Sequence, residues 1–272
     1  MTKKVALVTG ASSGIGSATA LEMQKKGFTV YGAARRTEMM TELANNGIHI
    51  ISLDVSDDDS MVNCVNSILE KEGRLDVLVN NAGYGSYGAI EDVPMEEARR
   101  QVEVNLFGLA RMTQLVLPNM RENKYGKIVN ISSMGGKVWT PFGGWYHATK
   151  FAVEGFSDCL RMEVKPFGID VVVIEPGGVK TDWGIIAAEN LKKTSVKGVY
   201  AQAAEKSSEG MKKNYTGNSM TSPEVIARCI AKAVTVHNPK TRYLLGYGAK
   251  PAVLIKNVFG DRIHDRFIQS IV

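Results

Sequence analysis

The sequence lacks the cysteine pairs, histidine clusters and long apolar runs that mark several large classes of protein. Its three cysteines, Cys64, Cys159 and Cys229, are scattered and odd in number, so we expect no disulfide framework and a reducing, cytoplasmic compartment. The four histidines show no metal-ligand spacing, and we predict no metal site. Apolar runs such as Val171–Ile174 have the length of strands and are far too short to span a membrane.

The sequence also lacks a large excess of charge of one sign. Lys and Arg number 33 against 28 Asp and Glu, which gives a net charge of +5. We interpret this excess as small and dispersed, which suits an anionic cofactor and excludes the clustered basic stripe of a nucleic-acid-binding protein. No membrane association is expected either, with a membrane-surface helix over residues 251–272 as the lesser alternative.

What the sequence does contain is a glycine-rich turn near its start. Lys3–Thr9 predicts a buried strand of a parallel sheet and not a secretion signal, and Phe28–Ala33 predicts a second strand. An amphipathic helix to about Lys26 separates them, which makes a βαβ unit. Glycines allow a tight turn, and a helix N-terminus offers free N–H groups to a pyrophosphate. We therefore predict a dinucleotide site at Gly10, Ser12, Ser13, Gly14, Ile15 and Gly16. The alternative is a glycine-rich turn that binds no ligand.

The end of the second predicted strand indicates which nicotinamide cofactor would fit. NAD-preferring sites place an acidic residue there to bind the ribose 2′-hydroxyl. The sequence instead continues through Arg35 and Arg36, and arginine makes bidentate contacts with phosphate. We predict NADP(H), with Arg35 as the 2′-phosphate ligand and Arg36 in reserve. The alternative is that both are solvated loop arginines.

Small and polar residues follow the other predicted strands where they end. Ligands of parallel α/β sheets lie outside these carboxyl ends. Asp54 would meet an adenine edge there, or would be an ordinary turn residue. The candidates after the third, fourth and sixth strands are Asp54, Val55, Asn81, Ala82, Gly83, Pro176, Gly177, Val179 and Thr181.

Tyr146 and Lys150 lie four positions apart in a predicted helix, and Ser133 follows the strand before that helix. Positions i and i+4 share one helix face, with Cβ atoms about 5–6 Å apart. An ammonium held there lowers the pKa of a phenol, which is ordinarily near 10, toward values useful for proton transfer. Taken alone the spacing is weak, because a half-buried Tyr beside a solvated Lys occurs in many helices.

Asn105 lies within an apolar run of the helical region predicted, with a possible break, over residues 94–122. A buried amide must find hydrogen-bond partners. Asn105 either satisfies backbone groups at a helix kink or holds a water molecule for proton relay, and the residues alone leave both alternatives open.

The order of the predicted elements indicates an α/β fold. We expect a single domain over residues 1–272, a doubly wound (Rossmann) parallel sheet of about seven strands with helices on both faces. Residues 182–221 are the least regular part, and apolar anchors such as Trp183 and Ile186 predict a substrate lid there. Residues 251–272 predict a helical tail that packs near the pocket or at a subunit interface.

As a set, these motifs resemble the short-chain dehydrogenase/reductase family in its compact single-domain branch. The resemblance covers about residues 3–182 and includes Thr9-Gly10-x-x-x-Gly14-x-Gly16, Asp54, Asn80–Gly83, Asn105, Ser133, Tyr146-x-x-x-Lys150 and Pro176-Gly177 with Thr181. Residues 81–85 and 175–181 are similar to the hydroxysteroid and retinol dehydrogenase group.

The resemblance implies a role for each of these residues. Tyr146 would be the acid/base, Ser133 would hydrogen-bond the substrate oxygen, and Lys150 would lower the pKa of Tyr146 and bind the nicotinamide ribose. Asn105 would hold a water molecule and Thr181 would contact the carboxamide. Ser12 would share the 2′-phosphate with Arg35, whereas Ser13 stands where some NADP(H)-binding members carry a basic residue.

We therefore predict an NADP(H)-dependent oxidoreductase that transfers a hydride between the nicotinamide and a carbonyl or secondary alcohol. The apolar lid indicates a hydrophobic small-molecule substrate, such as a steroid, retinoid or aryl ketone. The resemblance implies a homodimer or homotetramer through the helices around Asn105 and Phe156. A non-catalytic nucleotide-sensing regulator on the same fold and a sugar-nucleotide epimerase or dehydratase are the alternatives. The complete set of Ser133, Tyr146 and Lys150 argues against the first, and the lack of a larger C-terminal domain argues against the second.

Overall fold

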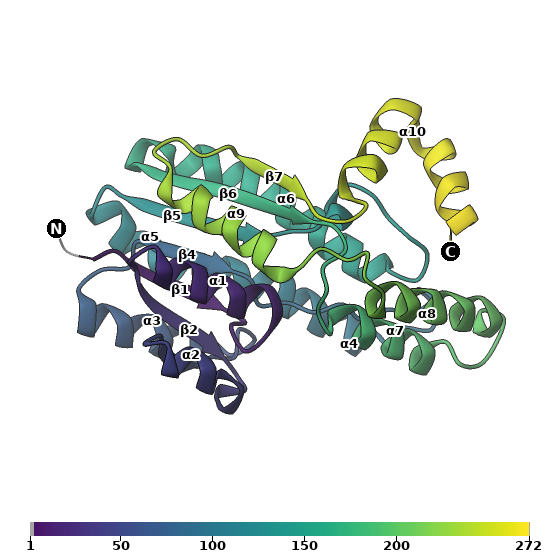
Figure 1. Cartoon of the computed structure of the whole chain (residues 1–272), viewed down its shortest axis with the longest axis horizontal. Coiled ribbons are helices and arrows are strands. Elements are labelled where there is room, and N and C mark those ends of the chain that lie inside the picture. Colours follow the sequence, from purple (N-terminus) through teal and green to yellow (C-terminus); the bar gives the residue numbers. More distant parts are fainter. Residues whose placement is uncertain (1–2, 272) are drawn as a thin grey trace.

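A seven-stranded parallel sheet forms the centre of the protein in the computed structural model, which describes residues 3–271 (Figure 1). The strands lie in the order β3-β2-β1-β4-β5-β6-β7, so the chain winds outward from β1 in both directions. The strands are β1 (Val5–Thr9), β2 (Thr29–Ala34), β3 (His49–Ser52), β4 (Val77–Asn80), β5 (Gly126–Ile131), β6 (Ile169–Pro176) and β7 (Arg242–Leu245). The predicted doubly wound sheet is confirmed.

Helices cover both faces of this sheet, which is why its central strands β1, β4 and β5 are buried along their whole length and are mostly apolar. On one face α1 and α9 pack against side chains such as Val8 and Val172, and on the other α3, α5 and α6 pack against side chains such as Leu7 and Ile128. The helices are α1 (Gly14–Lys25), α2 (Thr41–Asn45), α3 (Asp58–Glu72), α4 (Met95–Val102), α5 (Gly108–Glu122), α6 (Gly144–Val164), α7 (Trp183–Thr194), α8 (Ala201–Thr216), α9 (Pro223–Thr235) and α10 (Ala249–Ile271).

The structure differs from the sequence predictions in two segments, and in a third it contains a break that the sequence predicted as possible. The helical region over residues 94–122 is divided by a π-helical turn, Glu103–Phe107, between α4 and α5. Residues 182–221 are not irregular, because α7 and α8 form a helical hairpin whose helices pack on each other. The tail α10 bends sharply at Gly260, whose φ of 75° lies in the left-handed region (Figure 1).

Candidate active site

The glycine turn lies between the end of β1 and the start of α1, beside the segment that follows β4. Gly10 and Gly14 have φ values of 66° and 56°, which non-glycine residues rarely adopt. A Cβ on Gly16 would lie 2.3 Å from the Gly10 carbonyl oxygen and 2.5 Å from Asn81 Nδ2. Among the described residues the Ser13 side chain makes no capping bond to α1, which leaves first-turn N–H groups for a ligand. The turn therefore fits a pyrophosphate.

Asn81 braces this turn from the neighbouring strand. Its Nδ2 donates to the carbonyl oxygens of Thr9 at 2.9 Å and Gly10 at 3.2 Å. The Thr9 hydroxyl accepts hydrogen bonds from the backbone N–H groups of Asn81 and Ala82, both at 3.0 Å. Asn81 and Ala82 thus fix the turn, while Gly83 leaves room for Asn105, whose Oδ1 would lie 3.0 Å from a Cβ at that glycine.

Arg35 directly follows β2 and is largely exposed, with its Nη1 3.9 Å from Asp54 Oδ2. Asp54 is held by Ser56, whose N–H and hydroxyl both donate to its Oδ1. Burial opposes ionisation of Asp54, but the Ser56 hydrogen bonds and the Arg35 charge outweigh it and lower its pKa. Asp54 therefore serves as a turn residue in this structure and also restrains Arg35. Arg36 is exposed beside it.

The other predicted cofactor residues lie at the carboxyl edge of the sheet or just beyond it. Thr181 lies against the glycine turn, with its Cγ2 3.0 Å from a Cβ at Gly14. The backbone of Val55 lies against α5, where a Cβ on Gly108 would come 2.3 Å from its carbonyl oxygen. The remaining members of the set are Ser12, Ile15, Pro176, Gly177 and Val179. The fold thus brings the first and the last of the predicted cofactor residues in the chain, those of the glycine turn and Thr181, next to each other.

Ser133, Tyr146 and Lys150 come together where β5 ends and α6 begins. The Ser133 hydroxyl accepts a hydrogen bond from the Gly135 N–H at 3.0 Å and donates to the Pro176 carbonyl oxygen at 3.4 Å. Lys150 Nζ donates to the Ile131 carbonyl oxygen at 2.8 Å and lies 5.9 Å from the centre of the Tyr146 ring. The side chains of Tyr146 and Lys150 are both buried, so this is not a solvated Lys beside a half-buried Tyr.

The pKa of Tyr146 moves opposite to the predicted direction. Burial raises it above the usual value near 10, and the Ser133 hydroxyl only partly opposes that shift. Burial also lowers the pKa of Lys150 to about 8, with the Glu154 charge working against the change. The Tyr146 phenol is therefore neutral around neutral pH and can donate a proton, while Lys150 still carries its charge.

Asn105 lies in the π-helical turn and is buried. Its Oδ1 accepts from the Tyr84 N–H at 3.0 Å, and its Nδ2 donates to the Tyr84 carbonyl oxygen at 2.8 Å and to Thr149 Oγ1 at 3.2 Å. Of the two alternatives, the structure favours the one in which the amide satisfies backbone groups. Those groups belong to the loop after β4, and a role in proton relay stays a prediction.

Aromatic side chains enclose Tyr146 on the substrate side. The ring of Trp183, at the start of α7, has its centre 4.9 Å from that of Tyr146, and Tyr87 lies 5.9 Å from both rings. Tyr215 of α8 lies against Trp183 at 6.3 Å. The predicted contact between the lid and the site thus holds for Trp183, whereas Ile186 is half exposed.

His147 holds the loop between Ser133 and α6 in place. Its Nδ1 lies 2.9 Å from the Gly135 carbonyl oxygen, and its Nε2 accepts from the Thr140 N–H at 3.0 Å. These partners require the neutral tautomer protonated at Nδ1, and burial lowers the pKa of His147 accordingly. Sequence reasoning missed this residue and Tyr215. Only the adjacency of His147 to Tyr146 could have indicated it, and no local pattern singles out Tyr215.

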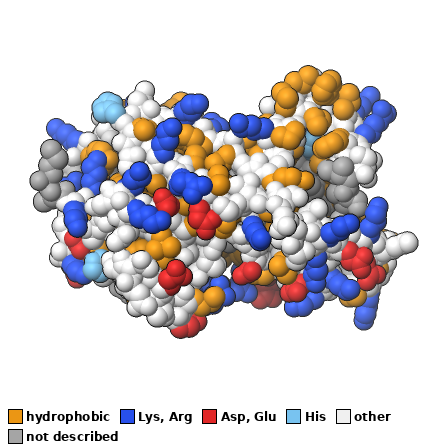
Figure 2. Space-filling view, viewed as in Figure 1, with side chains coloured by type: hydrophobic (Ala, Val, Ile, Leu, Met, Phe, Trp, Pro, Cys, Tyr) orange, Lys and Arg blue, Asp and Glu red, His pale blue; other side chains and the backbone are white. Residues whose placement is uncertain are grey.

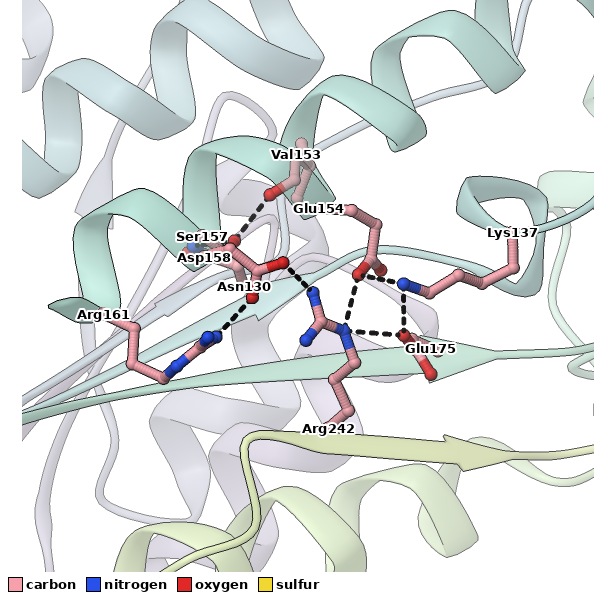
Figure 3. Close-up of polar contacts among 9 residues, drawn as sticks. All are labelled: Asn130, Lys137, Val153, Glu154, Ser157, Asp158, Arg161, Glu175 and Arg242. Atoms are coloured by element: carbon pink, nitrogen blue, oxygen red, sulfur yellow. Dashed lines mark hydrogen bonds and ion pairs between the residues drawn. The ribbon is translucent and has the colours of Figure 1, made fainter.

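A cluster of ion pairs lies one helical turn beyond Lys150 (Figure 3). Arg242 of β7 is its centre: Nε lies 2.9 Å from Glu154 and 3.3 Å from Glu175, and Nη2 lies 2.7 Å from Asp158. Lys137 lies 3.0 Å from Glu154 and 3.5 Å from Glu175. Burial and the neighbouring Glu154 charge raise the pKa of Glu175 despite both cations. The cluster ties α6, β6, β7 and the loop after Ser133 together.

These features define a nicotinamide-dependent type of site, and comparison with known proteins agrees. The sequence profile of the family described as short chain dehydrogenase matches residues 4–192. The chain belongs to the short-chain dehydrogenase/reductase family and is an oxidoreductase by that membership.

Among curated relatives, a probable short-chain type dehydrogenase/reductase VdlC of Helicobacter pylori is 35% identical over 98% of this chain and 97% of its own length. A 3-ketodihydrosphingosine reductase of Bacteroides thetaiotaomicron is 38% identical over 90% of this chain and 89% of its own.

Two solved structures are similar over most of their length. A short-chain dehydrogenase from Streptomyces avermitilis matches with a TM-score of 0.81 and 36% identity, over 93% of this chain and 92% of that one. An actinorhodin polyketide ketoreductase with NADPH matches with a TM-score of 0.76 and 32% identity, over 88% and 94%.

Two other kinds of feature are absent from residues 3–271. Within residues 3–271, no group of three or more His, Cys, Asp or Glu side chains could hold a metal ion. Over the same residues, none of the helices combines the length and the apolar character needed to cross a bilayer.

Proposed function

We propose that this protein is an NADPH-dependent reductase of a hydrophobic ketone, with Tyr146 as the proton donor. The observation that carries the proposal is the neutral, buried Tyr146 phenol beside Ser133 and Lys150, enclosed by Trp183 and Tyr87. A neutral phenol holds the proton that reduction of a carbonyl must deliver to the oxygen, which is the reductive direction. Aromatic walls favour an apolar substrate.

The cofactor preference rests on the end of β2. No acidic residue follows that strand directly, and Arg35 extends toward solvent from a position that Asp54 restrains. A solvent-facing guanidinium there would bind a 2′-phosphate and would gain nothing from a 2′-hydroxyl. The similar ketoreductase with NADPH supports this preference, and the relative named as a 3-ketodihydrosphingosine reductase supports a ketone substrate.

The residues of this chain would divide the work as follows. Bound NADPH would supply the hydride that reduces the carbonyl carbon. The Ser133 hydroxyl, fixed by Gly135 N–H, would orient the carbonyl oxygen and stabilise charge developing on it. The Tyr146 hydroxyl would then donate its proton to that oxygen. The Lys150 ammonium, anchored on the Ile131 carbonyl, would stabilise the phenolate that results.

The direct test is NADPH consumption by the purified protein across a panel of aliphatic, steroidal and aryl ketones, repeated with NADH. The proposal expects turnover with hydrophobic ketones and a clear preference for NADPH. If no ketone or aldehyde is reduced while NADPH binds tightly, the nucleotide-sensing alternative replaces it.

Arg35→Ala should weaken NADPH binding by about tenfold to a hundredfold, the usual effect of losing a charged hydrogen bond to phosphate. NADH binding should change little, because NADH has no 2′-phosphate. Fluorescence titration of both cofactors measures this, with Arg36→Ala as the control of smaller effect. An equal loss for both cofactors would refute the assignment.

Trp183→Ala should raise the substrate KM by about tenfold, because the variant removes a large apolar wall next to Tyr146. Cofactor affinity should stay close to that of the unaltered protein. Ile186→Ala on the same helix is the matched control, since that side chain is half exposed. Steady-state kinetics decide the matter, and a larger effect from Ile186→Ala would mean that the substrate lies elsewhere.

A further inference from the structure

The positive charge of the chain is concentrated in its last third. From residue 183 onward there are fourteen Lys and Arg against six Asp and Glu, a net charge of +8. The residues before that have nineteen against twenty-two, a net charge of −3. The sequence-based expectation that the basic residues are dispersed is therefore wrong. Such asymmetry is typical of chains that bind a polyanion or an anionic membrane surface.

The hairpin of α7 and α8 projects from the molecule (Figure 1). The turn between these helices exposes apolar side chains. Val199 is 87% exposed, with exposed Val196 and Tyr200 beside it. Lys193 and Lys197 are exposed on the same turn. A valine left this open gains nothing from the fold of the single chain, so it is available to another surface.

The bend of α10 repeats this arrangement at a second projecting point. Val258 and Phe259, directly before Gly260, are 62% and 57% exposed. Arg262 follows the bend and is exposed as well, next to exposed Asp261, which lies 3.9 Å from Lys256 Nζ. Figure 2 shows apolar side chains gathered over α10, with basic side chains at its outer edge. We call these two points, Val196–Tyr200 and Val258–Arg262, the apexes.

Both apexes belong to elements that border the candidate active site and lie at the same end of the molecule (Figure 1). Trp183, which packs on Tyr146, begins α7. Trp139, in the loop after Ser133, donates from Nε1 to Asp265 of α10 at 2.9 Å. A surface that contacts the apexes would therefore face the side from which an apolar substrate reaches Tyr146.

We propose that the two apexes dock this protein on an anionic lipid surface. Apolar side chains flanked by Lys and Arg are the composition that binds the boundary between headgroups and acyl chains, and each basic residue near such a surface adds attraction. A second copy of the chain fits less well, because each copy has a net charge of +8 from residue 183 onward and the two would repel each other. A nucleic acid fits less well, because its phosphates offer nothing to Val199, Val258 or Phe259. The proposal departs from the expected lack of membrane association, and it does not depend on the proposed reaction.

The test is co-sedimentation of the full chain with vesicles of phosphatidylcholine alone and of phosphatidylcholine mixed with phosphatidylglycerol. The unaltered protein should sediment with the mixed vesicles and stay in solution with phosphatidylcholine alone. Raised salt should release it, because salt screens the charge attraction. Val199→Asp and Val258→Asp should each lower the vesicle partition coefficient by about tenfold, since each removes one buried apolar contact.

Met162→Asp is the matched control, because Met162 is 67% exposed on α6, outside the apexes. It should bind mixed vesicles as the unaltered protein does, and thermal unfolding checks that all three variants are folded. Equal loss from Met162→Asp overturns the proposal, as does failure of the unaltered protein to sediment with anionic vesicles. Binding to DNA without binding to vesicles overturns it in favour of a polyanion. A change of mass in light scattering, again without vesicle binding, overturns it in favour of a contact between copies.

Discussion

Tyr146→Phe is expected to lower kcat by about a thousandfold, the usual contribution of a positioned proton donor. The variant removes one oxygen atom and keeps the ring that packs between Trp183 and Tyr87. NADPH affinity should therefore stay close to that of the unaltered protein. Ketone-dependent NADPH oxidation measures the first quantity, and fluorescence titration of the cofactor measures the second.

Tyr87→Phe is the matched control for this substitution. Tyr87 is as buried as Tyr146 and its ring lies 5.9 Å away, but it lies in the loop after β4 and not beside Lys150. Its pKa is also raised by burial, so a raised pKa alone does not make a phenol the proton donor. Near-normal turnover of Tyr146→Phe, or equal losses in the two variants, would exclude the assigned role.

Arg242→Met is expected to lower the free energy of unfolding by about 3 kcal/mol, because it leaves two buried carboxylates, Glu154 and Glu175, with Lys137 as their one remaining cation among the described residues. Glu154 and Glu175 are both buried, and Arg242 contacts both as well as Asp158 (Figure 3). Arg161→Met is the control. Arg161 contacts only the partly exposed Asp158, and its loss should cost about 1 kcal/mol or less.

The deficit of Arg242→Met should shrink as the pH falls. In the folded protein the pKa of Glu175 is raised, and it rises further without Arg242, so ionisation of Glu175 costs stability at high pH. The pKa of Asp158 is lowered to about 2, chiefly by its hydrogen bond from Arg242, so the unaltered protein loses that contribution as acid protonates Asp158. Both effects reduce, at low pH, the difference in the free energy of unfolding between the variant and the unaltered protein. Urea unfolding at about pH 8 and about pH 5 measures the contribution of Glu175, because that of Asp158 is lost only below about pH 4. A deficit that grows in acid would contradict the prediction. Adding Glu175→Gln to Arg242→Met should restore part of the loss.

The sequence was sufficient to predict the sheet and the small and polar residues that follow its strands at the carboxyl edge. Strands buried on both faces produce apolar runs, and ligands of parallel sheets gather where such runs end, so Gly10, Asn81 and Ser133 could be found from local pattern alone. The hairpin of α7 and α8 was not predictable in the same way. Its two helices pack chiefly on each other. Their aromatic contacts, such as that of Tyr215 with Trp183, join residues that are far apart in the sequence.

Two electrostatic features could not be predicted from the sequence either. The spacing of Tyr146 and Lys150 predicted a lowered phenol pKa, but the enclosure by Trp183 and Tyr87 raises it, and only the fold sets burial. The ion cluster joins Lys137, Glu175 and Arg242 from three segments separated by dozens of residues. No local sequence pattern indicates that these side chains are in contact.

The π-helical turn at Glu103–Phe107 restricts the insertions and deletions that this helix can accept. A turn with i→i+5 bonds holds one more residue than an α-helical turn, and each residue advances an α-helix by about 100°. Deleting one residue there would restore a continuous α-helix but would rotate α4 against α5 by about that angle. Asn105 would then leave Tyr84, and the buried face of α4, with Ala98 and Gln101, would point away from its partners. Single-residue insertions and deletions, harmless in most surface loops, should therefore be absent from this helix in every active homologue.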